Sequence, residues 1–127
     1  MLRFIPDELA IERGIHGYHQ NFLNAFMQYF DPAGANILEI GGAFNPTVAL
    51  EDIGARSWTS VQHPDFKYNE KREVLVKHRE RYTLIYKSFE DLDESELTSN
   101  HYDAVFSMAC FEHIQANTDD WKCSPYT

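Results

Sequence analysis

Cysteine and basic residues are scarce in this chain of 127 residues. Its two cysteines, Cys110 and Cys123, are too few for a disulfide framework and lack the Cys-x-x-Cys spacing of a zinc knuckle. Lysine and arginine total 11 against 20 acidic residues, and the resulting net charge of -9 repels the phosphates of nucleic acids and of anionic membranes. We therefore expect no disulfide scaffold and no direct nucleic-acid binding.

Long apolar runs are also lacking. No uninterrupted apolar stretch approaches the roughly 18 residues of a membrane-spanning helix. The first residues, Met1–Glu8, carry acidic groups where a signal peptide has its apolar core. Hydrophobic residues nevertheless make up 43% of the chain, enough for the core of one globular domain of this length. The composition predicts a cytoplasmic protein that makes no membrane contact.

The stretch Asn36–Thr47 is the most informative part of the sequence. Its apolar run, Ile37–Ile40, has the length of a buried strand, and Gly41 and Gly42 follow where the chain must turn. Asn45 is suited to cap a helix, and Pro46 is suited to the first helical position. A strand, a glycine turn and a helix over Thr47–Ile53 are typical of a doubly wound α/β sheet.

Glu39 is the unusual residue of this stretch, because it places a carboxyl group inside a largely buried strand. Burial of a charge is costly unless a partner compensates it. We expect a ligand, a buried amide or a cation beside Glu39.

Strand and helix patterns alternate along the remaining chain. Alternation implies crossover connections and hence a parallel sheet. The predicted fold is α/β: an incomplete Rossmann-like, doubly wound, mostly parallel sheet of about four strands with flanking helices. The further strands are predicted at Ser57–Val61, Tyr82–Tyr86 and Tyr102–Met108, and the helical segments at Gly17–Phe30, Phe66–Arg81, Asp91–Leu97 and Phe111–Ile114.

One domain accounts for the chain, with a polar lead-in over 1–16, an α/β core over 17–114 and an irregular tail over 115–127. The first predicted helix carries an apolar stripe at helical spacing. Packing on the sheet is the simpler interpretation of this stripe, and a partner-binding helix is the alternative. The stripe comprises Phe22, Leu23, Phe26, Met27 and Phe30.

Ligands of parallel sheets bind beyond the carboxyl ends of the strands. Those ends carry Gly41–Ala43, Gln62–His63, Ser88–Glu90 and Ser107–Met108. The chain has no phosphate-binding loop of the Walker type and no Gly-x-Ser-x-Gly elbow of a hydrolase. Two glycines of the dinucleotide fingerprint are missing, which disfavours a nicotinamide-dependent oxidoreductase. His16 and His19 lack the context of a zinc protease helix and are interpreted as surface residues.

Two segments resemble class I S-adenosylmethionine-dependent methyltransferases. Ile37–Ala43 is similar to the first motif of that family, and Tyr102–Ile114 is similar to its fourth strand and following helix. The two occur in the expected order with two strands between them, and the resemblance covers most of residues 30 to 115. It implies methyl transfer from S-adenosylmethionine to an acceptor that the sequence does not name.

The resemblance also implies cofactor contacts for individual residues. Gly41, Gly42 and Ala43 would lie against the methionine and ribose parts, and Glu39 would orient the loop or the ammonium group. Gln62 would meet the ribose, Ser88 and Phe89 would flank the adenine, and Ser107 and Met108 would pass below the methionine. No metal is implied.

The chain departs from the family pattern at several positions. Gln62 stands near the usual acidic residue of strand two, Ala43 and Asn45 replace glycines, and Ser88 replaces a commonly acidic residue. The family sheet has seven strands, whereas this chain ends soon after the fourth. We therefore expect a truncated form.

Two further questions stay open. His113 could act as a general base or could cap the helix after strand four, and Cys110 with His113 would be an incomplete metal site. The alternative to an enzyme is a non-catalytic remnant or interaction module, which would meet a protein partner or a second copy through its open sheet edge.

Overall fold

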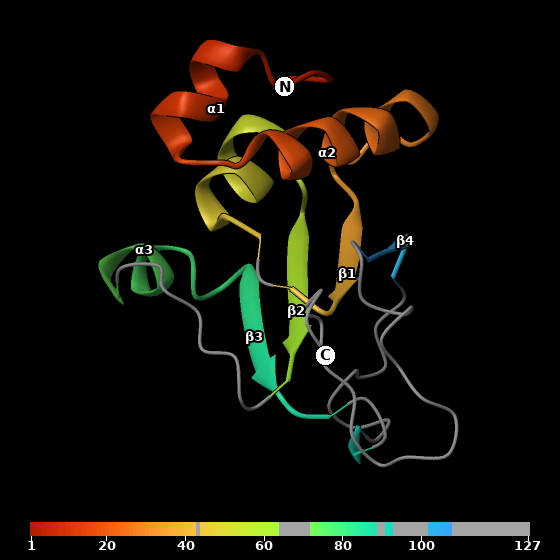
Figure 1. Cartoon of the computed structure of the whole chain (residues 1–127). Coiled ribbons are helices and arrows are strands. Elements are labelled where there is room, and N and C mark those ends of the chain that lie inside the picture. Colours follow the sequence, from red (N-terminus) through yellow and green to blue (C-terminus); the bar gives the residue numbers. More distant parts are fainter. Residues whose placement is uncertain (43, 64–71, 89–90, 93–101, 108–127) are drawn as a thin grey trace.

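A four-stranded parallel sheet organises the computed structural model, which describes residues 1–42, 44–63, 72–88, 91–92 and 102–107 (Figure 1). The predicted α/β class with a parallel sheet is confirmed. The elements are α1 (Asp7–Arg13), α2 (Gly17–Tyr29), β1 (Asn36–Ile40), the π-helix η1 (Val48–Asp52), β2 (Ser57–Gln62), α3 (Arg72–Lys77), β3 (Tyr82–Tyr86) and β4 (Ala104–Phe106).

The strand order is β3-β2-β1-β4, visible from left to right in Figure 1. The chain moves outward from β1 to β3 and then returns to the other side of β1, so the order reverses between β1 and β4. Right-handed crossovers that run in opposite directions place their connections on opposite faces of a sheet. The described parts agree with this rule: η1 and Leu75 of α3 pack on one face, whereas Leu92 and Tyr102, which lie between β3 and β4 in the chain, pack on the other.

The larger core lies on the face covered by α2 and η1. Ile37, Trp58 and Phe106 point to this face from three adjacent strands, and each is almost fully buried. Leu23 and Met27 of α2 pack there, as do several small and branched side chains around η1. The η1 contribution comprises Val48, Ala49, Leu50 and Ile53.

A smaller core occupies the opposite face. Leu38, Ile40 and Val61 form it, because side chains alternate between the two faces along a strand. Leu92 and Tyr102, both from the third crossover, pack against it. Their position agrees with the reversal of the strand order.

Helix α2 packs on the sheet as the simpler interpretation of its stripe predicts. The ring of Phe106 in β4 makes edge contacts with Phe22 at a centroid distance of 5.4 Å and with Phe26 at 4.9 Å. Phe26 also contacts Phe30 at 5.5 Å. Aromatic pairs in this geometry add to the stability gained from burial.

Helix α1 lies inside the predicted polar lead-in and was not expected. Asp7 and Glu8 stand in its first turn, Arg13 stands in its last, and Gly14 closes it with φ of +72°. These are ordinary start and stop signals. The preceding Ile5 is fully buried, and Gln20 and Asn24 of α2 bond its backbone. The lead-in is thus partly a packed element of the fold.

Several predicted segments are only partly described. The helix expected over 66–81 is described from residue 72 as α3, which ends at Lys77, so the prediction is wrong for the turn over 78–81. The strand expected over 102–108 is observed as β4 over the shorter range Ala104–Phe106. Most of the acidic helix over 91–97, the turn over 111–114 and the tail over 115–127 lie outside the described residues. Among the helices that the structure describes, none has the length and apolar character needed to cross a bilayer.

Candidate functional site

The carboxyl ends of the strands meet at one edge of the sheet. Ile40 pairs with Val61 of β2, and the next residue, Gly41, donates its backbone N–H to the Val61 carbonyl at 2.8 Å. Gln62 pairs with Tyr86 of β3 and accepts from the Lys87 backbone at 3.0 Å. This edge, at the reversal between β1 and β4, is where parallel sheets bind ligands.

The predicted site residues divide into two groups. Glu39, Gly41, Gly42, Gln62, Ser88 and Ser107 lie on the strands or directly beyond their carboxyl ends. Ala43, Phe89 and Met108 lie outside the described residues, as do Glu90, Cys110 and His113.

Both glycines after β1 have a steric role. Gly41 adopts φ of +86°, a left-handed conformation that a residue with a side chain rarely adopts. At Gly42, a Cβ atom would stand 2.6 Å from Glu39 Oε2, closer than a van der Waals contact allows. The turn therefore needs glycine at one position for its backbone and at the other for the carboxyl group beneath it.

Glu39 is 2% exposed, and hydrogen-bond donors surround one of its oxygens. Oε1 accepts from the Phe44 backbone N–H, from Trp58 Nε1–H and from Ser60 Oγ–H, each at 2.9 Å. Burial raises the pKa of Glu39, and these hydrogen bonds oppose the rise. The expected buried amide is confirmed as that of Phe44, and the indole and the hydroxyl are further donors that were not predicted. Glu39 forms no ion pair within the described part of the chain.

A second path of hydrogen bonds reaches the same loop from β3. Tyr82 donates its hydroxyl to the Phe44 carbonyl at 2.7 Å, and its oxygen lies 3.0 Å from Ser60 Oγ. Both backbone groups of Phe44 are thus held, the N–H by Glu39 and the carbonyl by Tyr82. The sequence prediction missed Trp58, Ser60 and Tyr82, and the polar residues of the second strand gave no local sign of which of them would meet Glu39.

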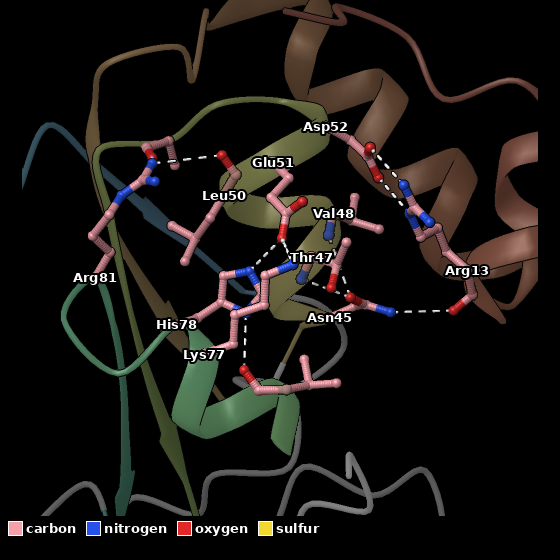
Figure 2. A network of polar contacts seen from close by, with 12 residues as sticks. Arg13, Asn45, Thr47, Val48, Leu50, Glu51, Asp52, Lys77, His78 and Arg81 are labelled. Atoms are coloured by element: carbon pink, nitrogen blue, oxygen red, sulfur yellow. Dashed lines mark hydrogen bonds and ion pairs between the residues drawn. The ribbon is translucent and has the colours of Figure 1, made fainter. Parts of the chain in front are cut away.

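Asn45 caps the helix that follows the glycine turn, as predicted. Its Oδ1 accepts from the backbone N–H groups of Thr47 at 2.9 Å and Val48 at 3.3 Å. Its Nδ2 donates to the Arg13 carbonyl at 3.1 Å, which joins the end of α1 to the start of this helix (Figure 2). The predicted helix continues as the π-helix η1, in which Ile53 N–H bonds the Val48 carbonyl at 3.0 Å.

Charged residues fix the outer side of η1 (Figure 2). Arg13 binds Asp52 through two nitrogens at 2.8 and 3.0 Å. Glu51 Oε2 lies 2.6 Å from His78 Nε2 and 3.2 Å from Lys77 Nζ. The hydrogen bonds from these two side chains lower the pKa of Glu51. The helix behind the turn is therefore held by α1 and by the segment around α3.

The polar side chains at the carboxyl ends of β2 and β4, Gln62 and Ser107, differ in their hydrogen bonding. Gln62 Oε1 accepts from the backbone N–H of His63 at 3.1 Å, so this side chain already bonds the backbone. Ser107 Oγ is buried and has no hydrogen-bond partner among the residues that the structure describes. A buried polar atom without a partner, located where the strand order reverses, is a candidate contact for a ligand.

The histidines interpreted as surface residues are exposed. His16 and His19 lie at the start of α2 with ring centroids 6.0 Å apart. Partial desolvation of the imidazole ring and the nearby His16 lower the pKa of His19, although the residue as a whole is exposed. Across the described ranges, no group of three or more histidine, cysteine or acidic side chains could hold a metal ion.

Comparisons with protein-family models, with curated proteins and with solved structures find no match to this chain.

Proposed function

We propose that this chain carries the donor-binding half of an S-adenosylmethionine-dependent methyltransferase fold, and that it binds S-adenosylmethionine at the Gly41–Gly42 turn. One observation carries the proposal: the turn follows a strand with a buried glutamate, beside the position where a 3-2-1-4 strand order reverses. The resemblance of residues 37–43 and 102–114 to the methyltransferase motifs supports it. The methyl acceptor is not identified.

The chemistry of this donor suits the described groups. The molecule has an ammonium group, a carboxylate, a ribose diol and an adenine edge, and it has no phosphate to hold. In the proposal, the glycine turn faces the methionine and ribose parts, Gln62 faces the ribose, and Ser107 lies below the methionine. Ser88 and Phe89 flank the adenine, and Ala43 and Met108 complete the contacts.

Methyl transfer would require positioning rather than a protein nucleophile. The sulfonium already activates the methyl group, so holding donor and acceptor in line removes much of the barrier. The backbone of the turn is fixed at Phe44 from β1 and β3, which is the rigidity that positioning needs. The cytoplasmic location stays a prediction.

Calorimetric titration with S-adenosylmethionine and S-adenosylhomocysteine tests the proposal. We expect saturable binding of both, and weaker binding in Gly42→Ala, whose new Cβ would displace Glu39. Gly17→Ala is the matched control, because a Cβ at Gly17 meets nothing within 4 Å. Absence of binding at millimolar ligand would refute the proposal, and clear binding of a nicotinamide dinucleotide alone would replace it.

The second candidate is a non-catalytic interaction module. It is favoured by one observation: β4 is an edge strand of the described sheet, and its central residue Val105 is 58% exposed. Exposed edge strands pair with other chains. Light scattering at increasing concentration tests this candidate, which predicts self-association that Val105→Lys abolishes.

A further inference from the structure

The imidazole ring of His78, directly after α3, contacts an oxygen atom at each of its two nitrogens. Nδ1 lies 2.9 Å from the carbonyl oxygen of Val74, one helical turn earlier in the chain. Nε2 lies 2.6 Å from Glu51 Oε2 of η1 (Figure 2). The His78 side chain is only 6% exposed, so water replaces neither contact. We call these two contacts the imidazole link, because they join the α3 segment to η1.

The two oxygen atoms decide how many protons the ring carries. A carbonyl oxygen has no hydrogen to donate, so the contact with Val74 requires a proton on Nδ1. An ionised carboxylate also only accepts, so the contact with Glu51 requires a proton on Nε2. Further donors to either oxygen do not change this count. A ring with both protons is an imidazolium cation, whereas a neutral ring carries one proton and leaves one contact without a donor.

The surroundings of Glu51 favour its ionised form. Its Oε2 also lies 3.2 Å from Lys77 Nζ, so two nitrogen groups converge on one oxygen. The Glu51 side chain is 41% exposed, and water therefore solvates the carboxylate. The hydrogen bonds from His78 and Lys77 lower the pKa of Glu51 in agreement with this geometry. The proton between His78 and Glu51 therefore belongs to the ring.

The other charged groups near the link have little effect on the ring. Lys77 has the same charge as an imidazolium, but its side chain is 67% exposed and its repulsion is screened by water. The guanidinium of Arg81 binds backbone carbonyl groups at and after the end of η1. Arg13 is paired with Asp52. Within the described part of the chain, Glu51 is the acidic group in contact with the ring.

We propose that His78 is an imidazolium cation in the folded protein at neutral pH, and that loss of one ring proton weakens the attachment of α3 to η1. A neutral ring that keeps its Nδ1 proton presents a bare nitrogen to Glu51. A neutral ring that keeps its Nε2 proton presents one to the Val74 carbonyl. Each form replaces one hydrogen bond of the imidazole link with a repulsion between lone pairs, so the link weakens as pH rises.

The imidazole link acts on the helix that follows the glycine turn. Asn45 caps this helix at its start, and the acidic side chains of η1 hold its outer side. Histidine is the side chain whose charge ordinarily changes close to neutral pH. The attachment of η1 to the α3 segment is thus sensitive to pH in this range, whether or not a ligand occupies the turn.

NMR of the ring nitrogens in the unmodified protein tests the charge of His78. An isolated imidazole titrates near about 6.5 and is mostly neutral at pH 7. We expect protons on both ring nitrogens of His78 at pH 7, and a single protonated nitrogen overturns the proposal. This test does not depend on a variant that folds.

Two variants test the role of the carboxylate. In Glu51→Gln, we expect His78 to lose its proton at a lower pH than in the wild type, because the ring loses its anionic partner. Lys77→Gln is the matched control: it removes a cation from the same Oε2 and should leave the titration of His78 unchanged or move it to higher pH. Equal downward movement in both variants, or none in Glu51→Gln, overturns the proposal.

Native-state hydrogen exchange tests the attachment of α3. The amides of His78 and Tyr82 bond the carbonyls of Val74 and His78 in this segment. We expect their protection, corrected for intrinsic exchange, to fall about tenfold from pH 6 to pH 8, as loss of a charged hydrogen bond predicts. In His78→Gln it should be low and independent of pH. The Phe30 amide of α2 is the internal control and should keep its protection. Constant protection at His78 and Tyr82, while the ring loses its proton, overturns the proposed weakening.

Discussion

Gly42 lies directly over the carboxyl group of Glu39, so closely that a Cβ atom there would stand 2.6 Å from Oε2. The carboxyl group cannot simply rotate away, because Oε1 holds Phe44, Trp58 and Ser60. The conformation of the turn and the position of the Glu39 carboxyl group in β1 therefore depend on each other, and substitutions at either place should change the stability of the fold.

Gly42→Ala is expected to destabilise the fold. Moving the carboxyl group weakens at least one buried hydrogen bond at Oε1, at a cost of about 1–3 kcal/mol. Urea denaturation gives this value directly. Gly17→Ala at the start of α2 has open space around the new Cβ and should change stability by less than about 1 kcal/mol, in the stabilising direction. Equal effects of the two substitutions would contradict the steric argument.

Glu39 should make stability depend on pH in a defined direction. Its pKa in the folded state is raised above the ordinary value of 4.5, so folding favours its protonated form. Its contribution is fully present below the unfolded pKa and is lost as pH rises through the folded pKa. The stability of the wild type relative to Glu39→Gln should therefore fall as pH rises from 4.5, measured by urea denaturation at several pH values. A rise over the same window would contradict the prediction.

Glu51 should act in the opposite sense at lower pH. Its pKa is lowered from 4.5 by hydrogen bonds from His78 and Lys77, so its contribution is present above the unfolded pKa and is lost as pH falls through the folded value. Glu51→Gln should remove part of the acid sensitivity of the wild type. The effect stays below about 1 kcal/mol, because the carboxylate is partly exposed. Glu8→Gln, an exposed carboxyl of α1, is the control and should leave the acid profile unchanged.

Tyr82→Phe removes the hydrogen bond to the Phe44 carbonyl and keeps the buried ring. We expect a loss of about 1–2 kcal/mol, because a buried carbonyl loses its donor. Native-state hydrogen exchange should show faster exchange of the Phe44 amide in this variant. Tyr29→Phe, at a residue that is 88% exposed, should stay within about 0.5 kcal/mol of the wild type. Unchanged exchange at Phe44 would mean that the Tyr82 hydroxyl does not hold the loop.

Asn45 has two functions that a pair of substitutions can separate. Asn45→Ala removes the helix cap and the bond to the Arg13 carbonyl, and should cost about 0.5–2 kcal/mol. Asn45→Asp keeps the capping oxygen and loses only the donor to Arg13, so it should retain most of the stability. Thermal unfolding of both variants measures how much the cap and the bond to the Arg13 carbonyl each contribute to stability. Asn21→Ala, at an exposed residue, is the control. If Asn45→Asp is as damaging as Asn45→Ala, the link to α1 outweighs the cap.

The sheet was predictable because its signals are local. The apolar run before two glycines predicted β1. The strand predicted over Tyr82–Tyr86 has the same first and last residues as β3. The cap at Asn45 followed from its position before Pro46. Helix α1 carried local signals as well, in its acidic first turn and in Gly14, but its short length and few apolar residues concealed them.

The hydrogen bonds around Glu39 were not predictable in detail. Periodicity shows that a polar residue occupies a buried face, but it does not show which polar groups meet. Ser60 is 21 residues from Glu39 in sequence, and Tyr82 is 38 residues from Phe44. These pairs depend on the register between strands, which brings Glu39 opposite Ser60 and Trp58 opposite Tyr82.

The indole of Trp58 has a consequence for experiments in solution. Because its Nε1–H bonds Glu39 Oε1 at 2.9 Å, any change of charge on that oxygen alters the electric field across the ring. Tryptophan emission responds to such fields. Trp58 is one of two tryptophans in the chain, and replacing Trp121 with phenylalanine would leave its fluorescence alone in the spectrum. The fluorescence of Trp58 would then report directly on the surroundings of the buried Glu39 carboxyl group.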